Sequence, residues 1–196
     1  SKYFGELDPP GPNPYGITFL PEYPEINVIS NVKTPDGTPI GNLGDGEAVW
    51  HADMTYIEQP PVAGILYSLE VPVGQGNTYF SSMIRAYEAL PDSLKREIEG
   101  KTLIHDAAHN SAGMLRKGYS ETTDPSETPG ARHPMVWTDT KGNRALFLGR
   151  RPHACIVGLT VDESNRLLDE VWSHATDPEW TWHNEWEVGD VVMWQN

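Results

Sequence analysis

The chain has 196 residues, a length that suits one domain with a sizeable buried core. Apolar residues make up 38% and charged residues 21% of the chain, which is a globular composition and excludes an intrinsically disordered one. The formal net charge of −14 argues against binding to nucleic acid or to an anionic membrane surface, because both need basic patches.

Residues 1–49 are dense in Pro and Gly, so loops are expected there with little regular structure. Short runs of apolar residues between turn signals predict the strands of the chain. In chain order, these strands cover residues 26–32, 49–56, 62–71, 78–81, 102–107, 133–138, 144–148, 180–186 and 191–194. Residues 108–132 are polar and are expected to form a loop.

Three helices are predicted among these strands, at residues 83–90, 93–98 and 161–175. Ser81 or Ser82 can cap the first helix, and Thr160 with Glu163 has the spacing of a capping box at the start of the last. Because strands and helices do not alternate regularly, we do not expect a doubly wound parallel sheet. The pattern predicts a mostly β fold with helical insertions, in which an antiparallel sheet of the jelly-roll or cupin type is closed or sandwiched.

The stretch Trp50-His51-Ala52-Asp53 carries the strongest chemical signal. In a strand, His51 and Asp53 would project to the same face, with Ala52 on the other. An imidazole and a carboxylate placed in this way can take adjacent positions on a small divalent metal, as in the two-His-one-carboxylate triad of non-haem iron oxygenases. Alone, the pair is weak evidence, because a structural His–Asp hydrogen bond is the commoner outcome.

Other polar residues give weaker signals. His109 and Asn110 follow the end of a predicted strand, where pocket-lining residues often lie, and they are candidates for contact with a substrate. Arg150 and Arg151 are expected to lie on the surface, where their positive charges offset part of the negative charge of the chain. Contact with an anion in a pocket is the less favoured alternative. Cys155 lies in an apolar run and is expected to be a buried, inert thiol.

A series of short motifs runs in a fixed order along the chain. These motifs are Phe4-Gly5-Glu6-Leu7, Trp50-His51-Ala52-Asp53-Met54-Thr55-Tyr56, Pro60-Pro61, Gly76-Asn77-Thr78, Ala86-Tyr87-Glu88-Ala89-Leu90-Pro91, His133-Pro134, Ala145-Leu146-Phe147, Glu163-Ser164 with Leu167-Leu168, and Gly189-Asp190 leading to Trp194-Gln195-Asn196. No single piece is specific. The ordered set, which covers essentially the whole chain, resembles the taurine dioxygenase (TauD/TfdA) family of Fe(II)- and 2-oxoglutarate-dependent dioxygenases.

The resemblance implies a double-stranded β-helix, a cupin-like jelly roll, with Fe(II) inside. His51 and Asp53 correspond to two iron ligands, and Thr78 to the residue that hydrogen-bonds 2-oxoglutarate. The implied reaction uses O2 to hydroxylate an unactivated C–H bond of a small organic substrate, while 2-oxoglutarate is decarboxylated to succinate and CO2. An Asp at position 53 fits hydroxylation, since related halogenases carry a small residue there.

The chain departs from the family pattern in two ways. The third ligand, a His, and the Arg that pairs with 2-oxoglutarate are expected beyond Asn196, and the family has a further stretch before Phe4. We therefore expect a single domain, residues 1–196, that is incomplete at both ends, binds Fe(II) poorly and does not turn over by itself. Glu47 stands where taurine-using members have an Asn near the substrate, so sulfonate specificity is not supported, and Glu47 is a candidate substrate contact.

Two alternatives stay open from the sequence. One is a non-catalytic fragment or a domain completed by a partner. The other is a different cupin-type metalloenzyme, such as an isomerase that uses Zn or Mn. The sparse use of cysteine and the absence of a signal peptide fit a cytoplasmic protein, no apolar run is long enough to span a membrane, and a homo-oligomer is compatible with the sequence.

Overall fold

The computed structural model describes residues 3–44 and 49–196. The α-helices are α1 (Met83–Ala89), α2 (Asp92–Ile98) and α3 (Val161–Ala175), and two 3-10 turns lie at Pro125–Glu127 and Pro178–Trp180. The strands are β1 (Ile29–Ser30), β2 (Asn42–Leu43), β3 (Ala63–Tyr67), β4 (Thr78–Ser81), β5 (Thr102–Ile104), β6 (Arg132–Pro134), β7 (Val136–Thr138), β8 (Arg144–Leu146), β9 (Cys155–Ile156), β10 (Thr181–Asn184) and β11 (Val191–Gln195).

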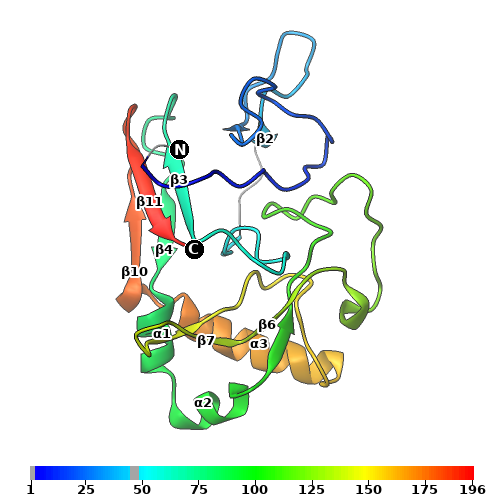
Figure 1. Ribbon diagram of the computed structural model, residues 1–196, viewed down its shortest axis with the longest axis vertical. Helices are drawn as coiled ribbons and strands as arrows, with labels where there is room; N and C mark the ends of the chain where they lie inside the picture. Colours follow the sequence, from blue (N-terminus) through cyan, green and yellow to red (C-terminus); the bar gives the residue numbers. More distant parts are fainter. Residues whose placement is uncertain (1–2, 45–48) are drawn as a thin grey trace.

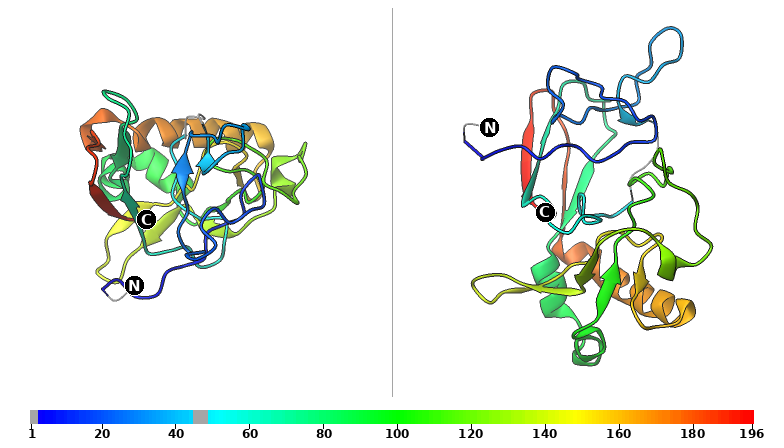
Figure 2. Two further views of the ribbon diagram at one scale, coloured as in Figure 1. Left: turned by 90° about the horizontal axis from the view of Figure 1, so that it is seen from above. Right: turned by 45° about the vertical axis from the view of Figure 1, so that its right-hand side comes forward.

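Two antiparallel ribbons join segments that are far apart in sequence. Strand β3 pairs with β11, and β4 pairs with β10. The two ribbons stand at one side of the molecule, above the helices, while the N-terminal loops and the β1–β2 pair occupy the rest of the upper part (Figure 1). The right-hand view of Figure 2 shows the same division, with the helices gathered at the opposite end from the N-terminal loops.

The hydrophobic core lies in the helical half. Helix α3 begins with the predicted capping box. The Thr160 side chain accepts a hydrogen bond from the Glu163 backbone amide, and the Glu163 side chain accepts one from the Thr160 backbone amide. The helix turns one apolar stripe inward, into a core cluster to which α1, α2 and the strands β5, β8 and β9 also contribute. The fully buried members of that stripe are Leu167, Leu168, Val171 and Ala175. The three predicted helices are therefore confirmed, and Cys155 is buried beside them as predicted.

The predicted strand at residues 49–56 is wrong. The segment makes one isolated bridge, between His51 and Arg150, and then turns. Met54 has a left-handed backbone with φ of 51°, and the Ile57 amide donates back to the Met54 carbonyl at 3.2 Å. A residue in this conformation ends the extended run, so strand alternation does not place the side chains of this segment.

The described residues also do not form a closed barrel, contrary to the closed or sandwiched sheet that we expected. They form five small sheets, and each of the two long ribbons has only two strands. One face of the β3–β11 ribbon stays open to solvent, where Ile65, Tyr67 and Val191 are exposed by 44%, 56% and 64%. Within the described part of the chain, no helix is long and apolar enough to cross a membrane.

Candidate metal centre

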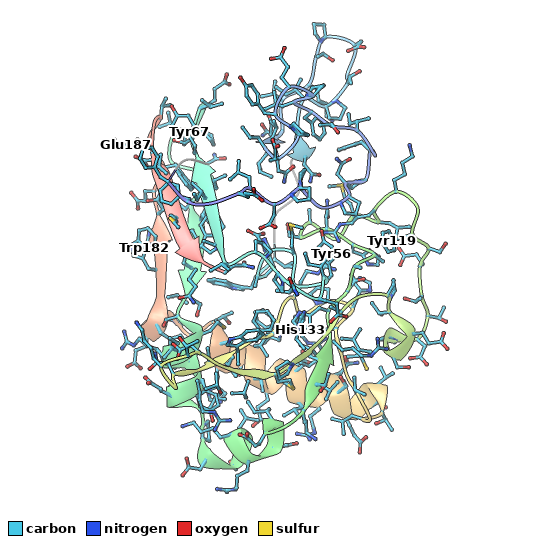
Figure 3. All side chains as sticks on the ribbon, in the orientation of Figure 1. Tyr56, Tyr67, Tyr119, His133, Trp182 and Glu187 are labelled. Atoms are coloured by element: carbon cyan, nitrogen blue, oxygen red, sulfur yellow. The ribbon has the colours of Figure 1, made fainter. Side chains whose placement is uncertain are left out.

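The segment with the His-x-Asp pair is held from two sides by distant backbone. The Ala52 amide donates to the Gly149 carbonyl at 2.9 Å, next to the His51–Arg150 bridge. On the other side, the Val49 amide donates to the Ser111 carbonyl at 3.0 Å. Tyr56, at the end of the segment, lies in the middle of the molecule, whereas Tyr67, Trp182 and Glu187 lie on the ribbons to one side (Figure 3).

His51 and Asp53 do meet, although not by strand alternation. The His51 Nε2 lies 3.3 Å from Asp53 Oδ1, and the two side chains are 31% and 42% exposed. The other ring nitrogen, Nδ1, lies 2.7 Å from the Val49 carbonyl oxygen. The carbonyl and the carboxylate can both only accept, so a protonated ring donates to Val49 from Nδ1 and to Asp53 from Nε2. When the hydrogen is on Nδ1 alone, Nε2 presents its lone pair to the carboxylate.

Two acceptors that face each other need a cation between them. A proton on the ring is one solution. Burial alone would lower the pKa of His51, but the hydrogen bond and the charge of Asp53, together with the Val49 carbonyl, raise this pKa above its usual value. A divalent metal is the other solution. With metal–ligand bonds of about 2.1 Å, two adjacent ligand atoms lie about 3 Å apart, close to the 3.3 Å observed. The pair therefore fits two of the ligands of a metal ion.

The described residues bring no third acidic, His or Cys side chain to the pair. Across residues 3–44 and 49–196, no group of three or more such side chains is placed to hold a metal ion. A third ligand beyond Asn196 stays a prediction.

Asn196 fixes the position of Asp53, a role that the sequence did not reveal. Its Oδ1 accepts from the Asp53 amide, and its Nδ2 donates to the Asp53 carbonyl, both at 2.7 Å. Nδ2 also donates to the Pro61 carbonyl at 3.2 Å, and the Asn196 amide donates to the Val62 carbonyl at 3.0 Å. The side-chain amide thus pairs with both the N–H and the C=O of one residue, as a residue on a neighbouring antiparallel strand would, at the end of β11.

Thr78 begins strand β4, which lies beside this segment. The rings of Trp50 and Tyr79 meet edge-on, with centroids 6.3 Å apart. The Trp186 indole Nε1 donates to Thr78 Oγ1 at 2.9 Å. Because Oγ1 already accepts there, its own O–H hydrogen is available to a further acceptor.

The predicted substrate contacts lie in different settings. Both ring nitrogens of His109 face carboxylates, Asp106 at 2.9 Å and Glu121 at 3.2 Å, and the side chain is 3% exposed. Contact between His109 Nε2 and a substrate would require Glu121 to move away. The Asn110 side chain is buried and its Nδ2 has no protein partner, so this donor is available. Glu47 lies outside the described residues.

Arg150 is not the surface residue that we expected. Its guanidinium donates to the Asp106 carboxylate and to the Asn110 carbonyl, and its side chain is 10% exposed. Arg151 does lie toward the outside, where its Nε is 2.6 Å from the Asp169 carboxylate. The anion that Arg150 meets belongs to the protein itself.

His105 is buried under the same region. Neither ring nitrogen has a hydrogen-bond partner, and the ring contacts His133 and Phe147 at centroid distances of 5.0 and 5.4 Å. Burial, with a smaller contribution from the charge of His133, lowers the pKa of His105 to about 3. His105 is therefore neutral in the folded protein at neutral pH.

Comparison with known proteins identifies the family of the chain. The profile of the family described as "Taurine catabolism dioxygenase TauD, TfdA family" matches residues 2–196. The chain is 32% identical over 185 residues to an alpha-ketoglutarate-dependent 2,4-dichlorophenoxyacetate dioxygenase of Burkholderia sp. (strain RASC), covering 89% of this chain and 60% of the relative. It is 30% identical to pentalenolactone F synthase of Streptomyces arenae, covering 89% of this chain and 62% of that protein.

Solved structures give the same result. The chain superposes on AAD-2 in complex with Mn(II) and N-oxalylglycine with a TM-score of 0.64 and 32% identity, covering 76% of this chain and 58% of that one. For a taurine dioxygenase from Burkholderia xenovorans the TM-score is 0.59 at 32% identity, covering 74% and 46%. The chain spans about 60% of the length of the curated relatives that it matches. It belongs to the TauD/TfdA family of dioxygenases.

Proposed function

We propose that this chain is the metal-binding part of an Fe(II)- and 2-oxoglutarate-dependent dioxygenase that hydroxylates an unactivated C–H bond of a small organic substrate. The overall reaction converts 2-oxoglutarate, O2 and R–H to succinate, CO2 and R–OH. The observation that carries the proposal is the facing pair of His51 Nε2 and Asp53 Oδ1, 3.3 Å apart and still accessible to solvent.

His51 and Asp53 would hold the Fe(II), which supplies O2 activation when bound. A third ligand is proposed to come from beyond Asn196. Within the chain, the Val49 carbonyl keeps the hydrogen of His51 on Nδ1, so that Nε2 is free to bind metal. Asn196 holds the peptide of Asp53 at a fixed position. These two contacts orient both ligands before the metal arrives.

Thr78 would contact 2-oxoglutarate. Its hydroxyl accepts from Trp186, so its hydrogen points to another acceptor, as a carboxylate of the co-substrate would require. Asn110 offers an unused, buried side-chain N–H, and this donor suits an oxygen atom of a substrate. Glu47 and His109 stay weaker candidates. Relatives of the chain include dioxygenases named for 2,4-dichlorophenoxyacetate, (S)-phenoxypropionate and a sulfate ester, which supports a small organic substrate.

A jelly roll closed around the metal is proposed for the whole protein, by likeness to the solved relatives. The ribbons β3–β11 and β4–β10 would supply part of its wall. We also propose that the protein is cytoplasmic.

A calorimetric titration tests the metal site and the co-substrate site together. N-oxalylglycine, the compound bound with Mn(II) in AAD-2, is added to the chain in the presence of Mn(II). We expect Mn(II)-dependent binding in the native sequence and none in His51→Ala or Asp53→Ala. Thr78→Val should weaken binding by about tenfold, the loss of one hydrogen bond to a charged group. His183→Ala, which changes an exposed histidine, is the matched control.

A second candidate is a binding domain without turnover, because only two ligands are present among the described residues. Release of labelled CO2 from 1-labelled 2-oxoglutarate, measured on a chain extended past Asn196 to include the proposed third ligand, separates the two. Fe(II)-dependent release that His51→Ala abolishes supports the oxygenase, and binding of N-oxalylglycine without any release supports the second candidate. Binding that is unchanged in His51→Ala would refute the proposed metal site.

A further inference from the structure

The backbone around His51 is tied to two segments that are distant in sequence. His51 pairs with Arg150, and the neighbouring Ala52 amide donates to Gly149. Two residues before His51, the Val49 amide donates to the Ser111 carbonyl, and the Val49 carbonyl oxygen lies 2.7 Å from His51 Nδ1. The direction of the imidazole therefore depends on how these two segments are placed relative to each other.

The Arg150 side chain connects the same two segments. From its position opposite His51, it reaches the Asn110 carbonyl, next to Ser111, and the Asp106 carboxylate. One guanidinium thus closes a ring of contacts that runs through Val49, His51 and back to Arg150. A guanidinium suits this task, because its planar array of donors has a fixed geometry.

The acceptor end of this connection is rigid. Asp106 is 1% exposed on its side chain and also accepts from the Ala108 amide at 2.7 Å and the His109 amide at 3.3 Å. The His109 ring contacts the same carboxylate at 2.9 Å and is backed by Glu121. Asp106 cannot shift without losing several of these bonds, so it holds Arg150 in one place.

We propose that Arg150 is a positioning residue for His51, which fixes the imidazole with its Nδ1 toward the Val49 carbonyl and its Nε2 toward Asp53. This proposal rests on the proposed role of His51 as a metal ligand. Arg150 acts through the backbone of both segments and does not itself touch the metal or the substrate. Arg151, the adjacent residue of the same type, contacts Asp169 and Asn165 on α3 and takes no part in the ring of contacts.

Histidine NMR on the metal-free chain tests the positioning directly. Long-range 1H–15N spectra report which ring nitrogen carries the hydrogen, and His51 is assigned by the loss of its signals in His51→Gln. The spectra are recorded at a pH where the ring is neutral and in an Asp53→Ala background, so that no carboxylate competes for the hydrogen at Nε2. We expect the Nδ1–H form with Arg150 in place and in Arg151→Gln. Arg150→Gln should give a mixture of the two forms. Arg150→Lys should be intermediate, because an ammonium can keep the charge but not the forked contact.

Mn(II) binding, followed by electron paramagnetic resonance, provides the second readout. Arg150→Gln should raise the Mn(II) Kd by about tenfold relative to Arg151→Gln. This is the effect expected when a residue that holds a metal ligand in place, without binding the metal itself, is removed. If Arg150→Gln does not fold, Arg150→Lys carries the same comparison. An unchanged His51 tautomer in Arg150→Gln, or equal Mn(II) affinities in the two glutamine variants, would overturn the proposal. If His51→Gln binds Mn(II) as well as the native sequence does, the proposed metal site fails instead, while the tautomer still tests the positioning.

Discussion

Protonation of His105 should be a main cause of acid sensitivity in this protein. The ring is 2% exposed, has no hydrogen-bond partner and has a pKa lowered to about 3, first by burial and then by His133. In the unfolded chain the pKa returns to about 6.5. Below that value the unfolded state binds a proton that the folded state cannot bind, so stability is lost as the pH falls from about 6.5 toward 3.

The size of the effect follows from the two pKa values. Between the two pKa values, each unit by which the pH falls lowers the free energy of unfolding by about 1.4 kcal/mol. At about pH 5, which is roughly 1.5 units below the unfolded value, His105 alone should reduce the free energy of unfolding by about 2 kcal/mol relative to pH 7.5.

Urea unfolding of the native sequence and of His105→Leu, at pH 7.5 and at pH 5, measures this contribution. We expect the loss of stability between the two pH values to be about 2 kcal/mol smaller in His105→Leu. Phe147→Leu, which removes a ring that packs on His105 without removing the titrating group, should lower stability at both pH values and keep most of the difference between them. An equal pH dependence in His105→Leu and the native sequence would refute the argument.

Three further substitutions test other contacts by urea unfolding. Asn196→Ala removes three side-chain hydrogen bonds and should lower the free energy of unfolding by about 2–3 kcal/mol. Gln195→Ala, at an exposed neighbouring position, should lower it little, and equal losses in the two variants would contradict the role of the Asn196 amide. Gly149→Ala should cost more than about 2 kcal/mol, because φ is 62° and the new Cβ would lie 2.1 Å from His105 Nδ1. Gly142→Ala, with φ of 87° and nothing within 4 Å, isolates the conformational part, about 1 kcal/mol. Thr160→Ala should cost about 1 kcal/mol by removing the cap of α3, and Thr160→Ser should restore most of it.

The elements that the sequence predicted best depend on local chemistry. Helix α3 begins at its capping box and turns its apolar stripe inward, and both signals lie within a few residues of each other. Strand β4 was predicted with its observed bounds, between a glycine turn and a capping serine. The expected closed sheet is not found among the described residues. Sheet closure depends on which strands meet across the whole chain, and the alternation within each strand carries no such information.

The candidate site was predicted in part, and partly for the wrong reason. The motif named His51 and Asp53 correctly as neighbours, but a bridge to Arg150 and a left-handed Met54 bring them together instead of a strand. The contacts of Arg150 and Asn196 join residues that are distant in sequence, so no local pattern indicates them. The residue type of Asn196 was the one signal available for its role. A side-chain amide offers both a donor and an acceptor, which can pair with a backbone C=O and N–H that have no strand neighbour.

The contact between Asn196 and Asp53 also has a consequence for the order of folding. It spans 143 residues of sequence, and closing a loop of that length costs about 4 kcal/mol of chain entropy by a simple polymer estimate. The helical half can pack through contacts that are closer in sequence, whereas the Asp53 peptide stays unpaired until β11 has been synthesised and docked. On the ribosome, His51 and Asp53 should therefore become ordered late. A nascent chain in which β11 has not yet docked would then carry the His-x-Asp motif without the fixed geometry that the proposed metal site requires.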